Sequence, residues 1–447
     1  MTGLTRPIVL GSVIAAAAFV AAPREIARPS SVVIITLDTT RADRLPAYGF
    51  QGVATPAIDR LAREGAVFDE TESVAPLTLV AHTSLFTGLY PPHHGVRDNL
   101  DTPLARSVPS LPELLERRGF RTAGIVGSIV LASDRGLARG FELYDDVNGV
   151  DHHGERVRRR TGGEVVDRAV DWIDRLTTRR FCLWVHLYDA HAPQSLPLEV
   201  RRVYGNSYEG GIAYVDSQVG RLLDALERKH LLETSAIVLT GDHGESLGDH
   251  GEREHGIFLY EAALHVPLVI RAPGVRPHRI HGVVSLVDIM PTVLDLLGFF
   301  VPHSIDGESL MPALRGHGRE DRVAYGESMY PKRFGWAPLR MIRDGGLKYI
   351  DAPRPELYDV YVDPFEQHDL SAEQPWTVAT LRRALNGMAR DRASDHPSDA
   401  MNVERLRMLA SLGYIEGSRP VSSKPSVVDL DPKDFIATYN AIREARH

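Results

Sequence analysis

Short apolar runs alternate with amphipathic segments over the first 300 residues of the chain. The runs are rich in β-branched side chains and predict buried strands; they lie at Ser31–Leu37, Thr122–Val126, Phe181–His186, Ala236–Leu239 and Val266–Arg271. Between them, apolar spacing and capping residues predict helices, at Thr55–Gly65, Thr78–Gly88, Pro109–Arg118, Thr161–Leu176, Ile212–Leu226 and Asp288–Leu297. The alternation predicts an α/β fold: a mostly parallel sheet with helices on both faces.

The pattern changes after residue 300. A hairpin around Asp344-Gly345-Gly346, a third strand and a covering helix are predicted there, at Arg340–Ile350, Glu356–Val362 and Gln374–Arg390. We therefore predict an α/β domain at residues 31–326 and a small antiparallel α+β subdomain at 327–395. A Ser/Pro-rich linker and a terminal helix, Pro432–Arg446, would occupy residues 396–447.

The N-terminal segment, residues 1–23, differs from the rest. Arg6 precedes an unbroken run of apolar and small residues, Pro7–Pro23, that ends near Ala21-Ala22. A charged start, a short apolar stretch and small residues are typical of a secretory signal, so we expect an exported protein, periplasmic or extracellular. An uncleaved segment would instead anchor the protein to a membrane.

Composition narrows the range of partners and cofactors. The formal charge of −8 argues against nucleic acid as a partner. Cys182 is the single cysteine among 447 residues, which excludes an internal disulfide and a cysteine-based zinc site. By contrast, there are 19 histidines, and several lie beside aspartate and glycine.

Acidic and imidazole side chains gather where predicted strands end. Asp38 follows the first run, and Asp242-His243 follows Ala236–Leu239; the others are His186, Asp189 and His191, and then His255. The carboxyl ends of parallel strands share one edge of a sheet, so these residues can meet. Two carboxylates and an imidazole suit a divalent cation, Zn²⁺, Mn²⁺, Mg²⁺ or Ca²⁺. A solvated acidic loop is the alternative for the Asp242 segment.

Thr78 offers the nucleophile that a set of metal ligands lacks. It begins a predicted helix, whose N-terminal amide groups and dipole favour an anionic substrate. Metal coordination would activate its hydroxyl. The alternative is an ordinary helix cap.

These residues lie in segments that resemble the sulfatase branch of the alkaline phosphatase superfamily. The segments follow one another in order over about 330 residues: Leu37–Asp43, Thr78–Gly88 with Tyr90-Pro91, His94–Val96, His186–Pro193, Thr240–Glu245, His255-Gly256, Val266–Leu268, Val287–Thr292, Glu356–Asp359 and Asp363-Pro364. The resemblance implies an alkaline-phosphatase-like fold and a metal-dependent hydrolase of anionic sulfate or phosphate esters. It implies metal binding by Asp38, Asp242, His243 and Thr78, with Thr78 as the nucleophile.

The resemblance also assigns residues to the substrate. His191 matches a position that contacts anionic oxygens, and His255 falls where these enzymes often place a lysine near the leaving group, so either imidazole would protonate the leaving oxygen. His82, His186, Asp189 and Asn99 are further candidates for substrate contact. Asn99 would alternatively stabilise a turn. His186, Asp189, His191 and His255 are also candidates for a weaker second ion, or would support the metal ligands from behind.

Departures from the family pattern point to phosphoryl chemistry. Sulfatases need Cys or Ser at the position of Thr78 to form formylglycine, and threonine cannot give that aldehyde. His82 stands where the family usually has an arginine, and Thr39 stands where it usually has the second acid of an Asp-Asp pair. Gly127–Val130 lacks the Lys and His that the family pattern leads one to expect. Family members with a threonine nucleophile act on phosphate mono- or diesters. Pro193 stands where two-metal phosphodiesterases place a histidine, which favours one ion, Zn²⁺ or Mn²⁺ above Ca²⁺ or Mg²⁺.

Two other functions remain open from the sequence. The first is a sulfuric ester hydrolase that works without formylglycine. The second is a catalytically degenerate binding protein on the same scaffold, which the missing Arg, Lys and second Asp would favour.

Overall fold

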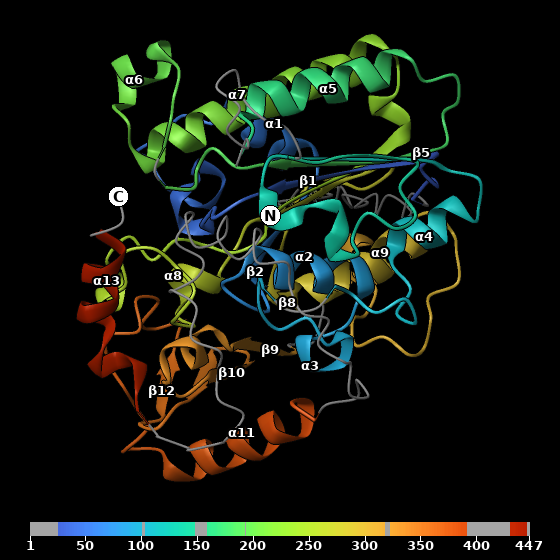
Figure 1. Ribbon diagram of the computed structural model, residues 1–447. Coiled ribbons are helices and arrows are strands. Elements are labelled where there is room, and N and C mark those ends of the chain that lie inside the picture. Colours follow the sequence, from blue (N-terminus) through green and yellow to red (C-terminus); the bar gives the residue numbers. More distant parts are fainter. Residues whose placement is uncertain are drawn as a thin grey trace, which may run out of the picture.

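The computed structural model describes residues 26–100, 103–147, 159–192, 194–317, 322–390 and 430–444. They form two sheets, one above the other in Figure 1. The larger sheet has eight strands in the order β4-β3-β5-β1-β6-β7-β2-β8, and the smaller has four in the order β12-β11-β10-β9. The predicted α/β class with a C-terminal antiparallel sheet is confirmed.

All strands of the larger sheet except β7 run parallel. Its strands are β1 Ser31–Leu37, β2 Ala66–Glu72, β3 Arg121–Val126, β4 Leu143–Asp145, β5 Phe181–Leu187, β6 Ser235–Gly241, β7 Leu268–Arg271 and β8 His278–Ser285. The sequence patterns did not predict β2, β4 and β8. In β8 the first residues are polar and partly exposed, and β2 turns acidic after three apolar residues, so neither forms a continuous apolar run.

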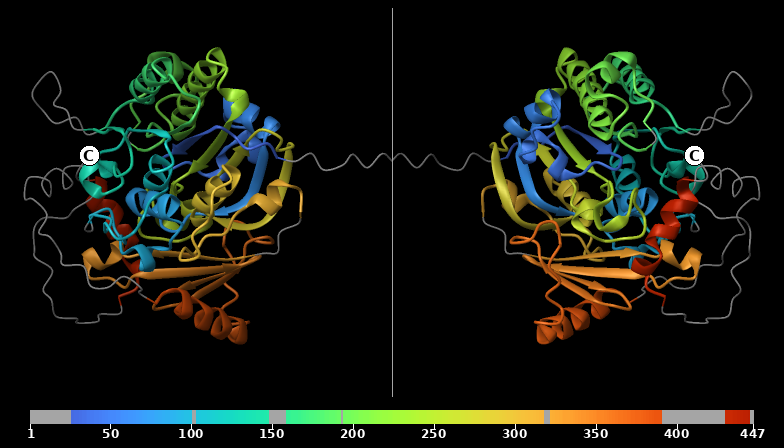
Figure 2. Two further views of the ribbon diagram at one scale, coloured as in Figure 1. Left: turned by 90° about the vertical axis from the view of Figure 1, so that its right-hand side faces the viewer. Right: turned by 90° about the vertical axis from the view of Figure 1, so that its left-hand side faces the viewer.

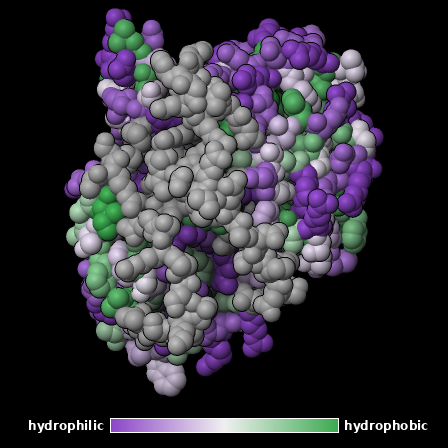
Figure 3. All heavy atoms as spheres, viewed as in Figure 1, coloured by the Kyte–Doolittle hydropathy of each residue, from purple (hydrophilic) through white to green (hydrophobic). Residues whose placement is uncertain are grey.

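Alternate β1 side chains point to opposite faces of this sheet. Both sets are mostly apolar and are buried, and helices cover both faces. Val33 and Ile35 belong to the core under α1, α5 and α7, and Val32 and Ile34 to the core over α2, α4 and α9. The helices of the two faces are α1 Pro56–Glu64, α5 Gly162–Asp174, α6 Leu198–Tyr204 and α7 Tyr208–Arg228, and then α2 Thr78–Thr87, α3 Pro91–His94, α4 Leu111–Glu116, α9 Ile289–Leu296 and α10 Met311–Leu314. In Figure 3 the surface over α5 and α7, at the top of the view, is mostly hydrophilic.

The smaller sheet lies beneath the larger one, with α11 on its outer face (Figure 2). Its elements are β9 Val323–Ser328, β10 Leu339–Asp344, β11 Leu347–Asp351, β12 Glu356–Asp359 and α11 Pro375–Met388. The predicted hairpin is present, with Gly345 at φ 57°. The third strand ends at Asp359, before the predicted Val362. The boundary expected between residues 326 and 327 falls inside β9, which carries a glycine and no long apolar run.

The predicted terminal helix is present as α13 Ile436–Glu444, after a short 3₁₀ turn at Pro432–Asp434. The predicted signal at 1–23 and most of the predicted linker lie outside the described residues. Within the described ranges, none of the helices combines the length and the apolar character that a membrane span requires.

A buried network of charges joins the two sheets. Arg343 on β10 and Lys348 on β11 are both fully buried. Arg343 pairs with Glu70 and Glu72 at the end of β2, and both cations pair with Glu261 of α8 (Glu261–Leu264), at 3.1 and 2.8 Å. Removing one member of such a network leaves its partners charged in a desolvated place.

We therefore expect Arg343→Ala to lower the free energy of unfolding by about 3–5 kcal/mol. Arg340 lies on the same strand, and its pair with Asp351 is partly exposed, so Arg340→Ala should cost at most about 1 kcal/mol. Urea unfolding followed by circular dichroism measures both. Equal losses in the two variants would contradict the structural importance of the buried network.

Candidate active site

The larger sheet brings Asp38, Asp242 and His243 to one edge. Leu37, the last residue of β1, lies in register with Leu187 of β5 and Gly241 of β6. The next residues along the chain are therefore neighbours, and the Asp242 N–H still donates to the Leu37 carbonyl. All three side chains are fully buried.

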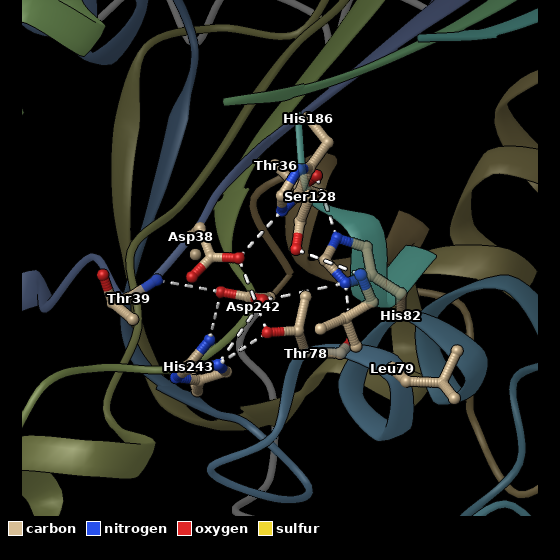
Figure 4. Close-up of polar contacts among 12 residues, drawn as sticks. Thr36, Asp38, Thr39, Thr78, Leu79, His82, Ser128, His186, Asp242 and His243 are labelled. Carbon is tan, nitrogen blue, oxygen red and sulfur yellow. Dashed lines mark hydrogen bonds and ion pairs between the residues drawn. The ribbon is translucent and has the colours of Figure 1, made fainter. Parts of the chain in front are cut away.

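The backbone after β1 turns sharply at Thr39. This residue has φ 50°, a left-handed conformation that a β-branched residue rarely adopts. The turn aims its N–H at Asp242 Oδ1, 3.1 Å away, and Figure 4 shows the Thr39 hydroxyl pointing away from that carboxylate. Strain of this kind is often found at functional sites, where the surroundings hold it in place.

Thr78 begins α2 and faces this group (Figure 4). Its Oγ1 lies 3.2 Å from His243 Nε2 and 3.5 Å from Asp38 Oδ2. His243 Nδ1 donates its proton to the Gly244 carbonyl at 2.9 Å, which leaves Nε2 facing the threonine hydroxyl. A histidine fixed in this way is typical of metal ligands and of general bases.

The two carboxylates retain oxygens that no described residue contacts by a hydrogen bond, Asp38 Oδ1 and Asp242 Oδ2. Ligand atoms of Asp38, Asp242 and His243 lie within 4.8 Å of one another. Burial raises the pKa of Asp38 to about 7; burial and then the charge of Asp38 raise the pKa of Asp242. Buried carboxylates need a compensating charge, and the donor set of two carboxylates and an imidazole fits a divalent cation.

His186 and His82 lie behind these carboxylates. His186 Nε2 donates to Asp38 Oδ2 at 3.0 Å. His82 Nδ1 donates to the Thr78 carbonyl at 2.7 Å, one helical turn back, and its Nε2 meets the Thr36 hydroxyl at 2.9 Å. Both ring nitrogens of His82 are therefore engaged within the protein. One ring nitrogen of His82 and one of His186 also lie within 4.8 Å of a carboxylate oxygen of Asp242.

His191 and His255 meet across 64 positions of sequence. Their Nε2 atoms are 3.1 Å apart, and each Nδ1 donates to a backbone carbonyl, that of Ala192 and that of Pro76 respectively. Burial lowers the pKa of both rings. With both Nδ1 atoms donating, the two Nε2 lone pairs face one another; a shared proton would relieve that repulsion, and burial opposes the charge that such a proton brings. His255 also packs on His243, with ring centroids 4.4 Å apart.

Asp189 and Asn99 each bind the first turn of a helix, Asp189 that of α5 and Asn99 that of α2. Asp189 Oδ2 accepts the Gly162 N–H at 2.7 Å and so caps α5. Asn99 Oδ1 accepts the Leu79 N–H at 2.9 Å, next to Thr78. The Asn99 side chain is buried, and its Nδ2 donates to no described residue. Asn99 thus binds an amide group in the first turn of α2 and keeps a spare donor there.

Arg41 and α13 also bear on the site, although no motif in the sequence points to a functional role for either. Arg41 is buried, pairs with Asp43 and Asp249, and donates to the Glu245 carbonyl, so it ties the turn after β1 to the loop after β6. An isolated arginine in a polar segment gives no spacing signal. Arg443 of α13 reaches Glu254, beside His255, across nearly 190 positions.

Known proteins are similar to this chain in sequence and in fold. The model of the sulfatase family matches residues 30–299, and that of the N-sulphoglucosamine sulphohydrolase C-terminal region matches 248–391. Arylsulfatase K of Rattus norvegicus is 30% identical over 210 residues, covering 44% of this chain and 36% of the relative. The chain thus spans about a third of the length of that relative.

Two further proteins match over most of the chain. N-acetylglucosamine-6-O-sulfatase of Bacteroides thetaiotaomicron is 24% identical over 471 residues, covering 77% of this chain and 83% of the relative. The solved structure of phosphonate monoester hydrolase of Agrobacterium radiobacter superposes with a TM-score of 0.68 at 23% identity, over 81% of this chain and 95% of that one. At this identity the second match establishes the alkaline-phosphatase-like fold.

Stabilisation by a divalent cation should grow with pH. Because the pKa of Asp38 rises from 3.8 to about 7 on folding, the folded carboxyl holds its proton more tightly than the unfolded one, and this group costs the metal-free protein stability as pH rises from about 4 to 7. A cation must displace that proton. We expect Mn²⁺ or Zn²⁺ to raise the melting temperature more at pH 8 than at pH 5.5. At pH 8, a hundredfold excess of the cation over its Kd should add about 2.7 kcal/mol of stability.

Scanning fluorimetry with and without EDTA measures this effect. Burial also raises the pKa of Asp189 to about 7, but Asp189 faces α5, so Asp189→Asn is a matched control that should keep the effect while Asp38→Asn loses it. Equal shifts at both pH values would refute the assignment.

Proposed function

The chain belongs to the sulfatase family, and on that premise we propose that it is a metal-dependent ester hydrolase in which Thr78 attacks an anionic phosphate ester. One observation carries the proposal: Thr78 Oγ1 stands at the start of α2, 3.2 Å from Nε2 of His243 and 3.5 Å from the carboxylate of Asp38. A hydroxyl so placed faces both a proton acceptor and the candidate ligands.

Asp38, Asp242, His243 and the Thr78 hydroxyl would hold one divalent ion, Zn²⁺ or Mn²⁺ by donor chemistry. When bound, such an ion lowers the pKa of a coordinated hydroxyl and offsets the charge of an anionic ester. His186 orients Asp38 through its Nε2–H, and Thr39 orients Asp242 through its N–H. His82 supports the first turn of α2 through the Thr78 carbonyl.

The reaction proceeds by double displacement. Thr78 Oγ1 gives its proton to the Asp38 carboxylate and forms a bond to phosphorus as the bond from phosphorus to the leaving oxygen breaks, and a proton shared by His191 and His255 would pass to that oxygen. Asn99 Nδ2 and the first amide groups of α2 bind the substrate's other oxygens. Water then cleaves the phosphothreonine, releasing phosphate and restoring the hydroxyl. In this hydrolysis the water gives one proton to the histidine pair, and Asp38 returns its proton to Thr78.

Threonine favours phosphate over sulfate as the reacting group. Oxidation of a threonine side chain gives a ketone, because its Cβ carries a methyl group, so Thr78 cannot become the formylglycine of sulfatases. The names of the relatives favour a second candidate, a sulfuric ester hydrolase that uses the threonine hydroxyl directly.

We also propose that the protein is exported, which the apolar stretch Pro7–Pro23 supports. N-terminal sequencing of the mature protein would test this proposal.

Removing the Thr78 hydroxyl should abolish turnover. We expect Thr78→Ala to lower kcat for 4-nitrophenyl phosphate with Mn²⁺ or Zn²⁺ by at least about 10³-fold, and Thr78→Ser to retain activity. Thr87→Ala, which removes a buried hydroxyl at the other end of α2, is the control. Mass spectrometry after acid quenching should find the phosphoryl group on Thr78.

Turnover of other esters separates the two candidate functions. The same assay is repeated with bis(4-nitrophenyl) phosphate, an aryl phosphonate and 4-nitrophenyl sulfate as substrates. Faster turnover of the sulfate would select the second candidate. Undiminished activity of Thr78→Ala on every ester would end the mechanism, and a protein with no affinity for these cations would favour a binding role.

Asn99 gives a second kinetic test. Asn99→Asp keeps the oxygen that accepts the Leu79 N–H but loses the Nδ2 donor, so we expect a folded enzyme with kcat lowered about 10²-fold. Asn99→Ala loses both contacts and should also lower the melting temperature. Wild-type kcat in Asn99→Asp would rule out Nδ2 as a substrate donor.

A further inference from the structure

The C-terminal helix α13 lies against the loop that carries His255. Asn440 on this helix holds the loop backbone twice: its Nδ2 donates to the Gly251 carbonyl at 2.6 Å, and its Oδ1 accepts the Arg253 N–H at 3.3 Å. One turn further along the helix, Arg443 forms an ion pair with Glu254, and both side chains are largely buried. The helix thus engages the residues that lead directly to His255.

The loop has a backbone that needs such support. Leu247, Gly248, His250 and Gly251 all have left-handed φ angles, 53°, 98°, 51° and 84°, and two of them are not glycine. Conformations of this kind persist only where the surrounding structure fixes them. A Cβ on Gly251 would lie 3.3 Å from Cγ2 of Ile436, so α13 covers this strained part of the loop closely.

On its other side, α13 is attached to the part of the chain that forms the smaller sheet. Phe435 stacks on Trp336 and Tyr439 packs on Phe334, each with ring centroids 5.4 Å apart. Arg354 pairs with both carboxylate oxygens of Asp434, at 2.8 and 3.0 Å. Figure 1 shows α13 at the edge of the molecule, between the smaller sheet and the larger one. The helix and the short turn before it therefore connect the segments next to the smaller sheet with the loop after β6.

We propose that α13 is a brace for the loop Gly248–His255, and that Arg443 and Asn440 are positioning residues that hold His255 on the leaving-group side of the site. The His255 ring is held by the Pro76 carbonyl at Nδ1, by His191 at Nε2 and by the ring of His243, while α13 holds the backbone that leads to it. A shift of the loop would move the imidazole relative to the nucleophile. This inference rests on the proposed role of His255.

Leaving-group dependence tests the brace. A good leaving group needs no proton, whereas a poor one does. With Mn²⁺ present, we expect Arg443→Ala to lower kcat/KM for phenyl phosphate at least tenfold more than for 4-nitrophenyl phosphate. Arg443→Lys, which keeps the charge, should recover most of the loss. Thr438→Ala, at an exposed position of the same helix, should match the wild type. Equal losses on both esters would refute positioning of His255.

Hydrogen exchange gives a readout that does not depend on turnover. Peptides covering residues 248–255 should exchange faster in Arg443→Ala and in Asn440→Ala than in the wild type or Thr438→Ala. Unchanged exchange in both variants would overturn the brace. If the wild type hydrolyses neither ester, the proposed function fails, while the exchange experiment still decides whether α13 holds the loop.

Discussion

Two carboxylates stand side by side in the interior of this protein, and their nearest ionic partners are histidines. Asp38 and Asp242 each retain an oxygen with no donor among the described residues, and their ion-pair contacts in the described chain are to His82, His186 and His243. Burial lowers the pKa of His82 and of His186, and a neutral imidazole cannot offset the charge of a carboxylate out of water. The surrounding architecture serves to hold this unbalanced pair together, and a divalent cation is the simplest partner that would balance it.

Much of that architecture was predictable because it depends on local patterns. A buried parallel strand is a continuous apolar run, and β1, β5 and β6 appear clearly as such. Once these strands are assigned to one parallel sheet, the meeting of Asp38, Asp242 and the His186 segment follows from topology. Thr78 at the start of α2 follows from helix signals as well. The particular role of each residue came from the family resemblance.

Other features depend on contacts that leave no local trace. The pairing of His191 with His255 depends on how two loops fold over the edge of the sheet, and the donor assignment of His82 depends on Thr36 lying opposite it. The edge strand β8 is half polar because only half of it is covered. The contact between α13 and the loop after β6 joins residues nearly 190 positions apart, and neither segment carries an apolar pattern that identifies the other.

The surroundings of His82 bear on how this protein has diverged from its relatives. The ring lies 5.2 Å from Trp184 and 5.1 Å from His186, centroid to centroid, and shares the Thr36 hydroxyl with the indole N–H. An arginine introduced here would bring a longer, permanently charged side chain into a closed aromatic cage. Thr36 and Trp184 would have to move to make room for it, so His82 and these two neighbours form a unit that a single substitution to arginine would disrupt.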